Sequence, residues 1–307
     1  MAILGIFSLF SCSVARVQGG NEDEEQLLQE TLRLVQEVKE FGRTLGIEPT
    51  EALSQSSREK PAQSMLWLWM QRQGTLALRA PIDIRLALRF SVTKDELPLE
   101  RLYNVSGYSI YFRQGNQFGD ARSVTTLNFA RESLVTKVKT ILHEDLHDDR
   151  NFDLPWESEE SLITPLGPLA AVEFFKRKGD AASAQKAQLE MEEERALSRE
   201  LNALAGEGEG LFKSEPLGAA RGKLIAQLLA RPTYARWFKF QLGEQQTETA
   251  LEAKISHDLA YYRYYDRIVS LHEKAGDLRG LVQNLKSAPQ TSDGEEMEKF
   301  LRELERQ

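Results

Sequence analysis

The chain has 307 residues, of which 41% are hydrophobic and 28% charged, as in an ordinary soluble globular protein of one large or two modest domains. Its formal net charge of -8, which no strongly basic stretch offsets, argues against a nucleic-acid partner. The single cysteine excludes an intrachain disulfide and a cysteine-rich structural zinc site.

The N-terminus predicts a processed, lipidated leader. Residues 1–10 are mostly apolar and lead through Ser11 into Cys12, a pattern typical of bacterial lipoprotein signals. We therefore expect residues 1–12 to form the signal segment and Cys12 to carry a lipid anchor in the bacterial cell envelope. Ser13, rather than an aspartate, follows the cysteine and favours the outer membrane, facing the periplasm. The alternative is a frayed apolar terminus with a free thiol, because no Lys or Arg precedes the apolar run.

A change of hydrophobic period divides the next hundred residues. Residues 13–24 are predicted to be a polar tether, residues 25–44 a helix with apolar residues near helical spacing, and residues 50–62 a polar loop. Apolar and polar residues then alternate strictly over residues 82–92, which predicts a half-buried strand. Further strands are expected at residues 75–79, 108–112 and 123–128.

The most informative segment is His143-Glu144-Asp145-Leu146-His147, a His-Glu-x-x-His sequence in a chain with four histidines. Apolar residues recur at spacings of three and four around it and predict a helix over residues 133–148, with Ser133 as N-cap. On a helix, His143 and His147 stand one above the other and can bind one metal ion through their imidazole nitrogens. Glu144 lies beside them, where it can take a proton from a metal-bound water. The alternative is a solvated helix end that carries two histidines by chance.

A catalytic zinc takes three protein ligands and leaves its fourth position to water. No third histidine follows His147 closely, which excludes the longer metzincin pattern. In the other large group of zincins a glutamate on a second helix completes the site, and the carboxylate-rich segment 156–162 supplies candidates. Glu160 is our choice, with Glu157 and Glu159 as rivals. For the two rivals, a charged helix N-terminus favoured by the helix dipole is the simpler explanation.

The remainder of the chain predicts helices. They are expected at residues 168–178, 181–205, 217–240 and 247–274, then a short one to residue 285 and a charged one at 295–307. The glycine-rich segment 205–210 is expected to break the helical run, and residues 287–295 to form a linker.

Two residues of the predicted helix 247–274 are candidates for substrate binding. His257 and Tyr261 are four apart and share a helix face. A Tyr or His often stabilises the oxyanion that forms when water attacks a peptide carbonyl. The simpler interpretation is that such residues pack the helix, with the tyrosine hydroxyls at the surface.

Three segments together carry a resemblance to a known family: Ile141–His147, Glu159–Ile163 and Ala170–Phe175. They resemble a bacterial family of predicted aminopeptidases, many of them lipoproteins, with a His-Glu-x-x-His helix and a glutamate on a downstream helix. The likeness extends over most of residues 25–290, through Thr31–Phe41, Val105–Phe112 and Tyr261–Tyr265. The family usually has an asparagine where Glu159 stands in this chain.

The patterns and the resemblance imply an α+β, zincin-like fold, with a small antiparallel or mixed sheet, the motif helix and a mainly helical C-terminal half. We expect a signal segment at residues 1–12 and a tether at residues 13–24. A catalytic domain is expected at residues 25–180, a helical subdomain at 181–286, and a linker with a terminal helix at 287–307.

The expected function is that of a zinc-dependent peptidase acting on peptide substrates, and the aminopeptidase activity is implied by the resemblance. His143, His147 and Glu160 would hold Zn²⁺, and Glu144 would act as general base and later as proton donor to the leaving amine. The alternative is a non-catalytic envelope lipoprotein whose zincin-like fold serves binding or scaffolding.

Overall fold

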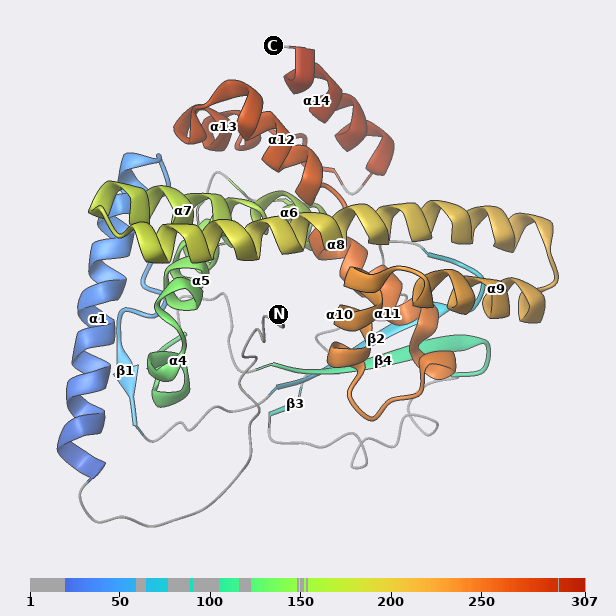
Figure 1. Cartoon of the computed structure of the whole chain (residues 1–307), viewed down its shortest axis with the longest axis horizontal. Helices are drawn as coiled ribbons and strands as arrows, with labels where there is room; N and C mark the ends of the chain where they lie inside the picture. Colours follow the sequence, from blue (N-terminus) through green and yellow to red (C-terminus); the bar gives the residue numbers. More distant parts are fainter. Residues whose placement is uncertain are drawn as a thin grey trace.

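The computed structural model describes residues 20–58, 65–76, 89–90, 105–115, 123–147, 149, 152, 154–291 and 293–306. These residues are mostly helical, with a small set of short strands, which agrees with the expected α+β class (Figure 1). The expected signal segment with Cys12, and most of the strand expected at residues 82–92, lie outside the described residues.

The larger sheet among the described residues has the order β3-β2-β4. Strand β2 (Met65–Arg72) lies in the centre and pairs antiparallel with β3 (Arg89–Phe90) and β4 (Tyr108–Gly115). Its register with β4 runs from Met65 opposite Gly115 to Arg72 opposite Tyr108. The strand expected at 108–112 is thus confirmed, whereas β2 was not predicted. Residues 68–71 are all buried, so β2 is covered on both faces and lacks the alternation that marks a half-buried strand.

A second, smaller sheet pairs β1 (Ser56–Ser57) in parallel with β5 (Thr125–Thr126). The strand expected over residues 123–128 is therefore only two residues long. It ends because Thr126 caps helix α4 (Leu127–Arg131), its side chain accepting a hydrogen bond from the backbone N–H of Phe129.

The helices of the first half follow the predicted order. Helix α1 (Gly20–Thr44) begins inside the expected tether, so residues 20–24 are helical. Helix α5 (Leu134–His147) matches the motif helix, and α6 (Trp156–Ile163) carries the candidate glutamates. Pro165 separates α6 from α7 (Leu166–Lys178). Pro168 is tolerated because it lies in the first turn of α7, where its missing N–H is not needed.

The break expected at residues 205–210 is wrong, because helix α8 (Ala181–Ser214) runs through it without interruption. At Gly208, close packing against neighbouring side chains explains why the helix contains a glycine. A Cβ at this position would lie 2.9 Å from a methyl group of Leu76 and 3.1 Å from one of Leu224. Gly208 therefore serves close packing between elements rather than a turn.

Two predicted helices are each divided in the structure. Residues 217–240 form α9 (Leu217–Leu229) and α10 (Pro232–Leu242), which begins with a proline at its first turn. Residues 247–274 form α11 (Thr247–Tyr262) and α12 (Tyr265–Ala275). The chain ends with α13 (Leu278–Leu285) and α14 (Gly294–Arg306), as expected.

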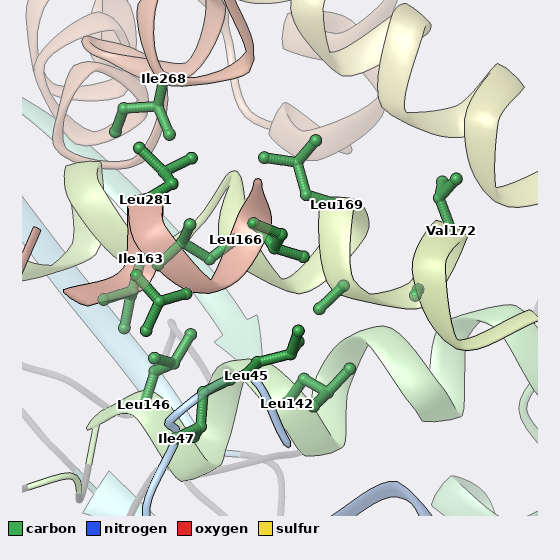
Figure 2. Close-up of a cluster of buried hydrophobic side chains, with 14 of the residues drawn as sticks. Leu45, Ile47, Leu142, Leu146, Ile163, Leu166, Leu169, Val172, Ile268 and Leu281 are labelled. Carbon is green, nitrogen blue, oxygen red and sulfur yellow. The ribbon is translucent and has the colours of Figure 1, made fainter. Parts of the chain in front are cut away.

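The buried apolar residues form two cores. The first core joins α1, α4, α5, α6, α7, the start of α8 and α12–α14; the second core joins β2, β4, the middle of α8 and α9–α11. Figure 1 shows α8 running along both groups of elements. In Figure 2, Leu142 and Leu146 of α5 face the first core together with Leu45, Ile163 and Leu166. Burial of each such side chain contributes about 1.5–3 kcal/mol to stability and fixes which face of α5 points inward.

Candidate metal centre

Helix α5 is fixed at its start and along one side. The hydroxyl oxygen of Ser133 accepts a hydrogen bond from the backbone N–H of Thr136 at 3.2 Å, which confirms the predicted N-cap. Helix α7 passes very close to α5, because a Cβ at Gly167 would lie 2.9 Å from the carbonyl oxygen of Lys139 and 3.5 Å from the Cβ of His143. A glycine is thus required at the level of the first motif histidine.

The structure brings the three predicted ligands together. The Nε2 atoms of His143 and His147 are 3.1 Å apart. One carboxylate oxygen of Glu160 lies 3.5 Å from Nε2 of His143, and the other lies 3.4 Å from Nε2 of His147. The candidate ligand atoms all lie within 4.8 Å of one another, so the group could bind a metal ion. The side chain of His143 is 21% exposed, that of His147 13% and that of Glu160 7%, so the group is partly open to solvent.

Glu160 is distinguished from its two rivals by position. Its carboxylate meets the Nε2 atoms of both histidines. The carboxylate of Glu159 instead approaches Nδ1 of His147, at 3.5 Å, on the far side of that ring. The side chain of Glu157 lies outside what the structure describes.

The charge around His147 is predominantly negative. Burial opposes protonation of its imidazole, but the negative charge of Glu160, hydrogen bonding to Glu159 and Glu160, and the charge of Glu144 outweigh burial and hold the pKa of His147 well above its usual value. Glu144 is half-buried on the same helix and close enough to contribute to that field. The nearby carboxylates therefore stabilise a positive charge at the position of the His147 imidazole.

Two buried aspartates, Asp145 of α5 and Asp149 just beyond its end, bind residues of other segments. Asp145 forms an ion pair with Lys39 of α1 and accepts hydrogen bonds from the backbone N–H and hydroxyl of Thr50, at 3.2 and 2.7 Å. Asp149 accepts hydrogen bonds from the backbone N–H of Glu48 at 3.0 Å and from Lys286 at 2.6 Å. The segment after α1 is thereby bound to the helix that carries the two motif histidines and to the residue just beyond its end.

Sequence reasoning missed this role. Asp145 occupies an unspecified position of the motif, and Asp149 lies just beyond the helix predicted over residues 133–148. Their spacing of four was a visible signal, but the lysine partners lie 106 and 137 residues away in the chain.

Helix α5 is also held to α8, by an ion pair between Lys139 and Glu194. Lys139 lies one turn before His143 and reaches the carboxylate of Glu194 at 2.8 Å. The other oxygen of Glu194 accepts a hydrogen bond from the Tyr265 hydroxyl, also at 2.8 Å. Burial opposes the charge of Lys139, but the carboxylates of Glu194 and Glu190 prevail and raise its pKa. The ammonium therefore stays charged and holds the two helices together.

His257 and Tyr261 lie on α11, near the second core. His257 is 9% exposed, and its ring packs edge-on against Trp69 and Tyr111 of the sheet. Its Nδ1 lies 3.0 Å from a carboxylate oxygen of Asp258. Tyr261 packs against Trp156, which precedes Glu160 by one turn of α6.

A buried polar group surrounds Asp258, and sequence reasoning did not find it. Lys254 forms an ion pair with Asp258, and the Tyr234 hydroxyl donates a hydrogen bond to the same carboxylate at 3.0 Å. Tyr234, Lys254, His257 and Asp258 are together called the α11 cluster below. Burial alone would raise the pKa of Asp258, but Lys254 and His257 lower it, so the carboxylate is held ionised.

In comparisons with known proteins, no family model, curated protein or solved structure matches the chain. Within the described part of the chain, none of the helices combines the length and the apolar character needed to cross a membrane.

Proposed function

We propose that this protein is a zinc-dependent peptidase, with His143, His147 and Glu160 as metal ligands and Glu144 as general base. The observation that carries the proposal is the convergence of the two Nε2 atoms and the Glu160 carboxylate within 4.8 Å. Two imidazoles and one carboxylate, with the fourth position left to water, are the ligand set of many catalytic zinc sites.

The separations between the ligand atoms suit an ion of this size. Around a tetrahedral zinc with bonds of about 2.0–2.1 Å, neighbouring ligand atoms lie about 3.3–3.4 Å apart. The two Nε2 atoms lie 3.1 Å apart, and each lies 3.5 or 3.4 Å from a different oxygen of the Glu160 carboxylate, close to that value. With one atom taken from each residue, the three candidate ligand atoms lie within 4.8 Å of one another. Two imidazole nitrogens also favour zinc over Ca²⁺ or Mg²⁺, which prefer sites built entirely from oxygen ligands.

The residues around the ligands supply the other requirements of hydrolysis. Zinc, when bound, acidifies a coordinated water and polarises a substrate carbonyl. Glu144 lies close enough to His147 to influence its charge, and its carboxylate would accept the water proton and return it to the leaving amine. His257 or Tyr261 would donate a hydrogen bond to the oxyanion, a role supported by the contact of Tyr261 with α6.

The sheet limits how a peptide could approach. The side-chain amide of Gln245 both donates to the carbonyl of Phe112, at 2.8 Å, and accepts from its N–H, at 3.0 Å. These contacts occupy the backbone of β4 at Phe112, so an extended substrate would not pair with the strand there. The aminopeptidase preference rests on the family resemblance, and the geometry of the ligands serves exopeptidase and endopeptidase action equally.

The proposal is tested by replacing the base and a ligand separately. Glu144→Gln should retain about one zinc per chain and lose at least about a hundredfold in the rate of peptide hydrolysis. His143→Ala should lose both zinc and activity. Metal content by mass spectrometry and cleavage of a peptide library give the two readouts. Equal activity in Glu144→Gln and wild type would contradict the mechanism; zinc binding without hydrolysis in the wild type would favour the binding or scaffold function.

We also propose that the protein is held at the bacterial envelope through a lipid on Cys12. Two or more acyl chains would anchor it firmly, because each buried methylene contributes about 0.8 kcal/mol. Expressed with its upstream region, the wild type should incorporate palmitate and sediment with membranes, and Cys12→Ser should be released. If the wild type is not labelled and stays in the soluble fraction, the proposed lipid anchor is wrong.

A further inference from the structure

We propose that Glu159 is a positioning residue that orients His147 for metal binding, an inference that rests on the proposed metal site. Glu159 and Glu160 are adjacent on α6, about 100° apart around the helix axis, so both carboxylates can face α5. One lies 3.5 Å from Nδ1 of His147 and the other 3.4 Å from its Nε2. The two nitrogens of one imidazole thus face two different carboxylates.

The chemistry of imidazole gives these two contacts different roles. A neutral histidine carries its proton on one ring nitrogen and offers a lone pair on the other. A carboxylate at Nδ1 holds the proton there, leaves the lone pair on Nε2 and fixes the plane of the ring. Glu159 would therefore direct Nε2 of His147 toward Nε2 of His143, 3.1 Å away, and toward the Glu160 carboxylate.

The burial of Glu159 argues against a solvated acid at a helix N-terminus. Its side chain is only 12% exposed, and it reaches toward α5 rather than into solvent. Thr164, one turn after Glu160, carries no charge that could take over the role. Its buried hydroxyl has no hydrogen-bond partner among the residues that the structure describes.

Glu159→Gln and Glu159→Ala test the inference through metal affinity rather than activity. Each variant should still bind about one metal ion per chain at saturation, with a dissociation constant raised about 10- to 100-fold, and alanine should have the larger effect. Affinity is measured by competition with a chromophoric chelator. With Co²⁺ as the probe, the visible spectrum should also shift, because a freed ring changes the ligand geometry.

Glu144→Gln is the matched control, because it removes a second carboxylate that acts on His147 through its charge. We expect it to weaken metal binding less than Glu159→Gln does. Equal weakening in the two variants would mean that Glu159 acts by charge alone, which would overturn the orienting role. An unchanged affinity in both Glu159 variants would overturn it as well.

Two further variants separate this inference from the site on which it rests. Glu160→Gln should reduce the bound metal far more than either Glu159 variant. Complete loss of metal in Glu159→Gln, with retention in Glu160→Gln, would make Glu159 a ligand and overturn the inference. If His143→Ala binds metal as well as the wild type, the metal site itself is wrong. Circular dichroism of the metal-free variants checks that each is folded.

Discussion

The metal centre and the α11 cluster both place charged groups inside the protein, but they balance charge in different ways. In the α11 cluster, Asp258 is met by the Lys254 ammonium, the Tyr234 hydroxyl and the His257 ring. In the metal centre, the Glu160 carboxylate contacts both histidines, Glu159 contacts His147, and the charge of Glu144 acts on His147. Lys254 balances the charge of Asp258 within the α11 cluster, whereas the metal centre gathers several carboxylates near two histidines and raises the pKa of His147.

The difference separates a group whose buried charge is balanced by its own side chains from one that a bound cation would balance. A buried charge is tolerated when a partner and hydrogen bonds compensate for the loss of water. The α11 cluster meets that condition with its own side chains. The metal centre would meet it with a bound cation, which supports the proposed function. Variants that affect one group and spare the other therefore test the comparison.

The largest effect on stability is expected from Asp258→Ala. The substitution leaves the fully buried Lys254 without its carboxylate, and the free energy of unfolding should fall by about 3–5 kcal/mol. Urea denaturation measures it, and zinc affinity should change little. The double variant Lys254→Met/Asp258→Ala should recover much of the loss. A loss below about 1 kcal/mol in Asp258→Ala would show that the pair is not a structural necessity.

Zinc should stabilise the protein through the metal centre alone. At a free concentration of about 100 times the dissociation constant, it should raise the free energy of unfolding by about 2.7 kcal/mol relative to the metal-free protein. His143→Ala should remove this increment, and variants of the α11 cluster that fold should keep it. Denaturation curves in zinc buffer and in chelator provide the comparison; an equal increment in His143→Ala would place the ion elsewhere.

Gly167→Ala should disturb the contact between α7 and α5. The new methyl group would lie 2.9 Å from the carbonyl oxygen of Lys139, so we expect a loss of about 1–3 kcal/mol and weaker metal binding. Gly206→Ala on α8 is the control, since a Cβ there meets nothing within 4 Å. It should stabilise the helix by up to about 1 kcal/mol. A neutral Gly167→Ala would show that the helices can separate without consequence.

The smallest expected effect is the loss of folding stability at low pH that comes from Asp258. The pKa of Asp258 is lowered in the folded protein, so its contribution is fully present above the unfolded value of 3.8 and is lost as pH falls through the folded pKa. Stability measured from pH 6 downward should decline less steeply in Asp258→Asn than in wild type once pH is below about 4. Identical slopes below that pH would contradict a lowered pKa.

Short-range patterns determined the features that depend on a few neighbouring residues. The spacing of His143 and His147, the N-cap at Ser133 and the apolar face of α5 all follow from helix geometry within one or two turns. The glutamate-bearing helix α6 was also visible, because its acids stand ahead of an apolar stretch. Strand β2 escaped prediction because burial on both faces removed its alternation.

The sequence by itself thus predicted the candidate ligand residues and determined the helix that carries the two histidines. Tertiary structure alone decided that Glu160 meets both histidines, while Glu159 approaches the other nitrogen of His147. It also decided that Asp145 and Asp149 bind lysines more than a hundred residues away, and that Gly208 lies inside a helix. The physical reason is that neighbouring residues on a helix share similar local patterns, and only the packing of one element against another selects which side chain reaches which atom.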